Sequence, residues 1–219
     1  MKEPFTESFE GTSARMFDEM ALAPVRQLNA HALDTLRDCA RHPAWAGSAW
    51  AVALGPDFST LSPELRAELA RSSVCLLEFA LSISGVAAAT GFAREHQAPP
   101  PFLSLDTAIE LSQITLSLAW TFSRLDMDAT TIVFGLAAVE AQRIRSLDVR
   151  DIPRIAERIC GQLRPRWLAR PRIWHELLRH RGATKASNLA PPHLRILQRQ
   201  LAASWLATGA TRSTRRTGA

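Results

Sequence analysis

The fold is decided by residues 134–167, FGLAAVEAQRIRSLDVRDIPRIAERICGQLRPRW, an apolar block that becomes basic toward its end. A weaker copy of its apolar pattern lies upstream, between residues 53 and 79. When the later block is shifted back by 86 positions, apolar residues coincide: Leu61 with Leu147, Leu69 with Ile155, Ala70 with Ala156 and Leu77 with Leu163. Recurrence at a fixed spacing is typical of a repeated structural unit, so the sequence predicts two versions of one small fold.

The two versions differ most in charge. Residues 1–110 carry 8 Lys/Arg against 14 Asp/Glu, whereas residues 111–219 carry 18 against 7, and the whole chain has a formal charge of +5. Such asymmetry between halves is typical of proteins in which one part meets nucleic acid or another polyanion. We therefore expect the second unit to contact a polyanion and the first unit to do something else.

The predicted class is all-α, because apolar residues recur at helical spacing and no stretch keeps the two-residue alternation of a strand. We expect a loose acidic arm at 1–20, an acidic unit at 21–105, a basic unit at 106–207 and a basic tail at 208–219. Ser62 and Asp106 are expected to cap helices, and a helix over 44–54 is expected to stop at Gly55 and Pro56. The helix predicted at 106–125 is apolar on two faces, so we expect both units to share it as a central buried helix.

The cysteine content indicates a reducing compartment. The chain has 3 widely spaced cysteines, which form no disulfide framework. The first residues lack the apolar core of a secretory signal, and the most apolar stretch, residues 79–92, is too short to span a bilayer. We therefore expect a soluble, cytoplasmic protein that makes no contact with a membrane.

Residues 128–160 have the proportions of a helix-turn-helix segment, with Asp148 expected to cap the last helix. Arg150, Arg154 and Arg158 recur every four residues and should line one helical face, which suits contact with phosphates. The alternative is an ordinary solvated face in which Arg154 pairs with Asp151. The candidates for DNA contact are Arg143, Arg145, Arg150, Arg154, Arg158, Arg164 and Arg166.

Neither a metal site nor a catalytic site is predicted. Cys39 and His42 have the spacing of half a zinc site, but no second pair follows at a suitable spacing. The sequence contains no phosphate loop, no dinucleotide-binding glycine motif and no serine-hydrolase motif. We therefore expect a protein that is not an enzyme and that uses no cofactor.

Three short stretches carry a resemblance to a known family: ITLSL at 114–118, FGL at 134–136 and LRPRW at 163–167, with Ile144, Leu147, Ile155 and Ala156 between them. This pattern resembles the FlhD family of flagellar master transcriptional regulators, and residues 194–205 are similar to that family's C-terminal helix. The first unit shows the same pattern in a weaker form. Because this chain is about twice as long as one family subunit, the resemblance implies a tandem whose two units imitate a dimer within one chain.

The resemblance carries expectations about function. The FlhD family is all-helical and dimeric, and it acts with a zinc-containing partner, FlhC, to bind promoter DNA and recruit RNA polymerase. We therefore expect a DNA-associated transcriptional activator of flagellar or mobile-element promoters, with an FlhC-like partner and RNA polymerase; the chain could also form a homo-oligomer. The alternative is a protein-interaction regulator, an anti-activator or adaptor, which binds a regulatory partner and not DNA.

Overall fold

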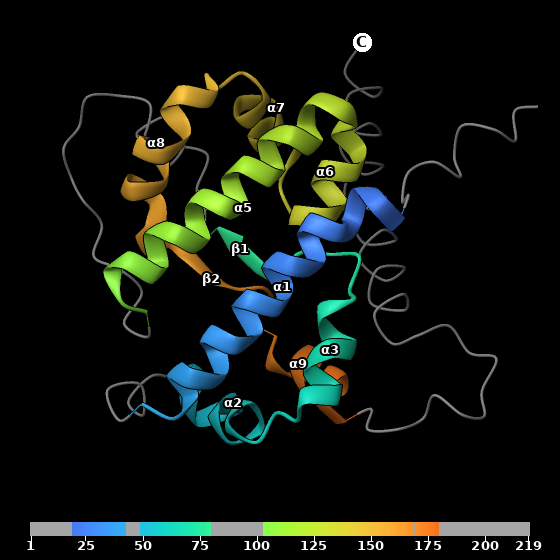
Figure 1. Cartoon of the computed structure of the whole chain (residues 1–219), viewed down its shortest axis with the longest axis vertical. Coiled ribbons are helices and arrows are strands. Elements are labelled where there is room, and N and C mark those ends of the chain that lie inside the picture. The colour runs from blue at the N-terminus through green and yellow to red at the C-terminus, as the bar shows by residue number, and fades with distance from the viewer. Residues whose placement is uncertain (1–18, 43–48, 80–102, 169, 180–219) are drawn as a thin grey trace, which may run out of the picture.

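A computed structural model describes residues 19–42, 49–79, 103–168 and 170–179, and these form an essentially all-α fold, as the sequence predicts (Figure 1). The helices are α1 (Glu19–Ala40), α2 (Ala49–Ser59), α3 (Pro63–Ala70), α5 (Leu105–Leu125), α6 (Met127–Phe134), α7 (Ala138–Arg145), α8 (Ile152–Ile159) and α9 (Pro171–Arg179). Two strands, β1 (Leu77–Phe79) and β2 (Leu163–Pro165), escaped prediction because three residues are too few to show alternation. The expectations for the acidic arm up to residue 18, the helix at 194–205 and the basic tail lie outside the described residues.

Side-chain oxygens cap the N-termini of three helices. Ser62 Oγ accepts a hydrogen bond from the backbone N–H of Leu65 at 3.2 Å, which confirms it as the cap of α3. The prediction for Asp106 is wrong: α5 is capped by Ser104, and Asp106 lies in its first turn, where a negative charge favours the helix. Asp126 caps α6 in the same way.

Helix α2 continues beyond the point where the sequence predicts its end. Gly55 and Pro56 both lie inside it, and it ends at Ser59. The helix buries Leu54 before Gly55 and, in its continuation, Phe58, whose ring meets Trp174 edge-on with centroids 5.1 Å apart. Burial of two large side chains therefore outweighs the backbone hydrogen bond that a proline removes.

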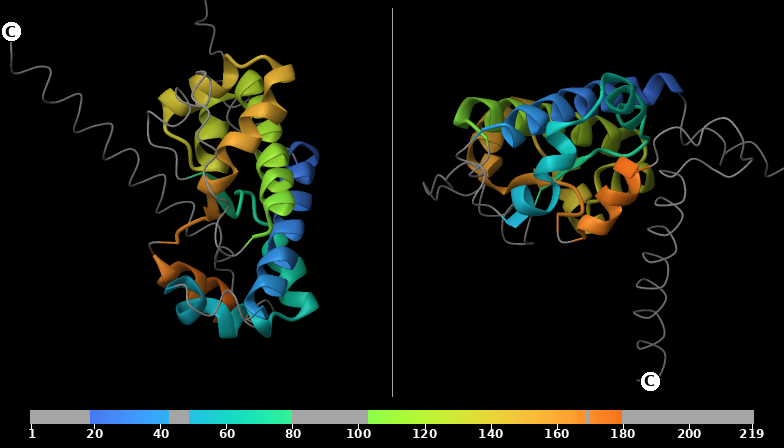
Figure 2. Two further views of the ribbon diagram at one scale, coloured as in Figure 1. Left: turned by 90° about the vertical axis from the view of Figure 1, so that its left-hand side faces the viewer. Right: turned by 90° about the horizontal axis from the view of Figure 1, so that it is seen from below.

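The buried side chains form two cores. The first core joins the N-terminal half of α1 to helices α5 to α8 and the two strands. The second core joins the C-terminal half of α1 to α2, α3 and α9, with Trp167 and Trp174 at its centre. Figure 2 shows α9 beside α2 at the end of the molecule opposite α6 and α7. Helix α1 contributes to both cores. The buried apolar side chains of α5 lie in the first core, which also contains residues of α1 and β1, so α5 packs against elements of both units, as expected.

The repeat is visible in the order of the elements. Helix α1 begins at residue 19 and α5 at residue 105, and β1 begins at residue 77 and β2 at residue 163, so both pairs are separated by the predicted 86 positions. The strands pair antiparallel, with Glu78 opposite Arg164, Leu77 opposite Pro165 and Phe79 opposite Leu163. Glu78 and Arg164 are themselves repeat equivalents, so a local two-fold relation passes through this pair. An isologous dimer interface has the same property.

Gly135 ends α6 in a backbone conformation that other residues adopt at a cost. Its φ is +68°, and a Cβ there would lie 2.9 Å from the Nη2 atom of Arg166. Gly135→Ala should therefore lower the free energy of unfolding by about 1–3 kcal/mol, because the left-handed conformation and the close approach both penalise it. Urea unfolding monitored by circular dichroism measures this effect.

Ala137→Ser, which supplies the missing side-chain cap of α7, should instead stabilise the fold by about 1 kcal/mol.

Candidate nucleic-acid interface

An arginine-rich surface follows the chain from α7 through the 3₁₀ turn Val149–Asp151 into α8. We call it the basic face and define it as Arg143, Arg145, Arg150, Arg154 and Arg158. It forms because the opposite side of α8 is apolar and buried, with Ile152, Ile155 and Ile159 each no more than 2% exposed. Arg145, Arg150 and Arg154 are exposed, and Arg143 and Arg158 are half-buried. The predicted separation of arginine and isoleucine sides is therefore confirmed for Arg150 and Arg154, whereas Arg158, also expected to be exposed, is half-buried.

Two hydrogen bonds hold the turn that carries the basic face. The carboxylate of Asp148 accepts from the backbone N–H of Arg150 at 2.9 Å, so Asp148 caps the 3₁₀ turn, and α8 itself begins four residues later. The indole Nε1 of Trp120 donates to the carbonyl of Leu147 at 3.0 Å. Because Trp120 belongs to α5, the turn between α7 and α8 is tied to a long helix of the first core.

The acidic side chains of this segment leave a positive excess. Arg154 forms an ion pair with Asp151 at 3.0 Å, as the solvated-face interpretation expects, and both side chains are close to half exposed. Exposed pairs of this kind contribute about 0–1 kcal/mol, so a phosphate can replace the carboxylate at little cost. Four acidic residues, Glu140, Asp148, Asp151 and Glu157, lie in the same segment as the five arginines, so its formal excess is one positive charge. The carboxylate of Glu140 is buried and accepts from the backbone N–H of Ala137 at 2.8 Å.

A further arginine, Arg124, lies over the ring of Trp120, the residue that bonds the turn of the basic face. It is exposed near the end of α5, and its guanidinium lies over the Trp120 ring, 5.0 Å from the ring centroid. Trp120 in turn bonds the turn before Asp148. Sequence reasoning missed Arg124 because its relation to the basic face depends on tertiary packing; the i, i+4 spacing of Trp120 and Arg124 was the only local signal.

Two of the predicted contact residues serve the fold. Arg164 is half-buried and pairs across the strands with Glu78 at 2.9 Å. Arg166 is 4% exposed, and its guanidinium donates to the carbonyls of Val133 at 2.8 Å, Ile132 at 3.1 Å and Cys75 at 3.3 Å. The prediction is therefore wrong for Arg166, which joins the end of α6 to the segment before β1. Burial also lowers the pKa of its guanidinium from the ordinary value.

The cysteines have the properties of packed thiols. Burial and the charge of Asp38 raise the pKa of Cys39 to about 11, and burial raises the pKa of Cys75 to about 11. Burial also raises the pKa of Cys160. Within the described residues, no three His, Cys, Asp or Glu side chains gather as a metal site requires.

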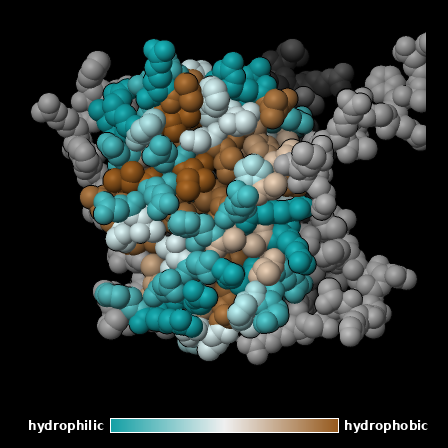
Figure 3. All heavy atoms as spheres, viewed as in Figure 1, coloured by the Kyte–Doolittle hydropathy of each residue, from teal (hydrophilic) through white to brown (hydrophobic). Residues whose placement is uncertain are grey.

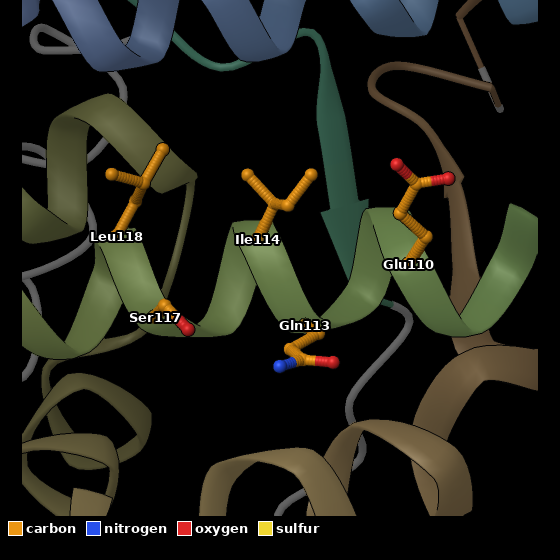
Figure 4. Close-up of a pocket in the computed structure, with 5 residues that line it drawn as sticks. All are labelled: Glu110, Gln113, Ile114, Ser117 and Leu118. Carbon is orange, nitrogen blue, oxygen red and sulfur yellow. The ribbon is translucent and has the colours of Figure 1, made fainter.

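A shallow hollow of about 420 Å³ follows the surface of α5 and is lined by Glu110, Gln113, Ile114, Ser117 and Leu118 (Figure 4). Glu110, Ile114 and Leu118 point toward α1, and Gln113 and Ser117 point the other way. An apolar area crosses this part of the surface, whereas the lower half of the same view is mostly hydrophilic (Figure 3). Ile114 and Leu118 are half-buried and pack against the first core.

No helix among the described residues is long and apolar enough to span a bilayer. The chain matches no protein-family model, no curated protein and no solved structure. Function must therefore be inferred from the residues of this chain itself.

Proposed function

We propose that this protein is a DNA-associated transcriptional regulator of the FlhD type, which binds promoter DNA through the basic face. The observation that carries the proposal is the basic face itself, five arginines on successive elements whose apolar sides are buried. Arginine suits this role because its planar guanidinium binds phosphate oxygens with two parallel hydrogen bonds. Residues 111–219 carry more basic than acidic residues, which also supports the basic face as the surface that lies nearest to DNA.

The order of α7, turn and α8 indicates how the contact would be made. In helix-turn-helix proteins the second helix presents its N-terminal residues to the major groove while the first crosses the backbone. Arg150 and Arg154 occupy the N-terminal part of the second element, and Arg143 and Arg145 lie in the last turn of the first. In this proposal Arg150 and Arg154 meet DNA at or inside the groove, and Arg143 and Arg145 meet phosphates. An FlhC-like partner and RNA polymerase belong to the proposal as the protein contacts of such a regulator.

The experiment replaces Arg150, Arg154 and Arg158 together by alanine and compares binding to promoter fragments of the chain's own gene neighbourhood. Loss of three phosphate contacts should weaken association roughly a hundredfold near 0.15 M salt, with the thermal stability unchanged. The matched control removes three arginines of the first unit, Arg37, Arg41 and Arg71, and should bind as the wild type does. Each chain is measured alone and with the product of the adjacent gene. Equal loss in the two variants would contradict a specific role for the basic face.

The alternative function is a protein-interaction regulator that does not touch DNA. The excess of acidic over basic residues in the first 110 residues favours it, because an acidic surface suits a basic site on a partner. Absence of DNA binding by the wild-type chain in both settings, together with recovery of a stoichiometric protein partner, would favour this alternative.

A further inference from the structure

The turn that carries the basic face has a counterpart 86 residues earlier. Helix α2 ends at Ser59 and Ser62 caps α3, just as α7 ends at Arg145 and Asp148 caps the turn into α8. The two segments also bury equivalent residues. Phe58 and its equivalent Ile144 are fully buried, and Leu69 and its equivalent Ile155 are almost fully buried. The two segments therefore present equivalent positions to solvent.

Three of these equivalent outward positions carry an acidic residue on the first unit and an arginine on the second, whereas the exposed Arg71 and its equivalent Glu157 have the reverse arrangement. In each unit, one of these three positions lies two residues before the end of the first helix, at residue 57 or 143. The other two lie two and six residues after the cap, at residues 64 and 68 or 150 and 154. The pairs are Asp57 with Arg143, Glu64 with Arg150 and Glu68 with Arg154. Asp57 and Glu64 are exposed and Glu68 is half-buried. We call these three carboxylates the acidic face; it occupies on the first unit the place that the basic face occupies on the second.

The opposite charges decide what each face can do near DNA. A protein with two equivalent DNA-binding faces, related by a two-fold axis, reads an inverted repeat because each face meets one half-site. In this chain the strand pair of Glu78 and Arg164 supplies the two-fold relation. The acidic face, however, meets phosphates with like charge, which is unfavourable at the second half-site.

We infer that the chain, although built like a dimer, binds DNA through its second unit alone and recognises a site without two-fold symmetry, one chain to each site. This inference rests on the proposed function and names the kind of DNA that would be bound. The acidic face keeps the first unit away from the DNA, so the two-fold arrangement serves the fold and not the recognition of a palindrome.

The test uses the full chain and a pool of random-sequence duplexes from which bound DNA is selected, with and without the product of the adjacent gene. Two variants with equal and opposite charge changes accompany the wild type, E64R/E68R and R150E/R154E. The equivalent positions of the second unit, 150 and 154, already hold arginine. Thermal unfolding of all three chains checks that they fold.

The inference predicts a selected wild-type sequence without an inverted repeat, and one chain per duplex. R150E/R154E should bind at least about thirtyfold more weakly near 0.15 M salt, because two phosphate contacts are lost. E64R/E68R should bind more tightly, with a plot of log K against log salt steeper by about 1.8 for two added contacts.

A wild-type site with an inverted repeat would overturn the inference while leaving DNA binding in place. So would an E64R/E68R chain that binds with the affinity and salt slope of the wild type, because the acidic face would then have no influence on DNA. Absence of DNA binding by the folded wild-type chain in both settings would overturn the proposed function and this inference together.

Discussion

Replacing Asn29 with leucine should destabilise the protein by about 3–6 kcal/mol, a large part of the stability of a typical domain. Asn29 is completely buried on α1, and its amide Nδ2 donates to the carbonyl of Val74 at 2.9 Å and to that of Ser72 at 3.4 Å. Its Oδ1 accepts from the backbone N–H of Leu76 at 2.8 Å. Leucine has a similar size but leaves all three backbone groups buried without this partner.

Urea unfolding at constant m-value measures the change. Gln27→Leu, an exposed position on the same helix, is the matched control and should alter the free energy of unfolding by less than about 0.5 kcal/mol. If Asn29→Leu unfolds at the same urea concentration as the wild type, the segment before β1 does not depend on this amide for its position.

The second large effect concerns Arg166. Arg166→Met should lower the free energy of unfolding by about 2–4 kcal/mol, because three carbonyls lose a charged hydrogen-bond donor. Removal of the buried charge offsets part of this loss. Arg154→Met removes an exposed guanidinium and should cost less than about 1 kcal/mol. Thermal unfolding of both variants separates a residue that holds the fold from one that is free to meet a ligand.

The same pair of variants separates the two roles in binding. Arg154→Met should weaken DNA association with the fold intact, whereas Arg166→Met should bind like the wild type at temperatures where it remains folded. A stable Arg166→Met variant that loses DNA binding would show that Arg166 reaches the ligand after all.

The sequence predicts well where periodicity is strong. The isoleucines at 152, 155 and 159 mark the buried side of α8, so the exposure of Arg150 and Arg154 could be deduced. Arg166 could not be placed in this way, because LRPRW has no helical period and the carbonyls that hold its guanidinium come from segments about 30 and 90 residues away. Local patterns carry no information about such distant partners.

No local pattern indicates that α1 is the helix that reaches both cores. The two apolar faces of α5 correctly indicate burial against both units, because its buried apolar side chains share the first core with residues of α1, β1 and helices α6 to α8. Helix α1 reaches both cores because Leu33 and Leu36 in its C-terminal half belong to the second core, where α1 packs against α2 and α3. Helix α9 packs against α2 of the first unit, a tertiary contact that no local sequence pattern indicates. The opposite charges of the acidic and basic faces can be predicted from the sequence, because the shift of 86 positions aligns the acidic residues of the first face with arginines of the second.

The most direct test of DNA recognition by the basic face is the salt dependence of association between the full chain and a mixed-sequence duplex. With three to five arginines on phosphates, log K should fall against log salt with a slope of about −2.7 to −4.5. Replacing Arg150, Arg154 and Arg158 by alanine should bring that slope close to zero if three contacts are made, and leave about −1.8 if five are made. A wild-type slope near zero, or the same slope in both chains, would contradict recognition of DNA by this face.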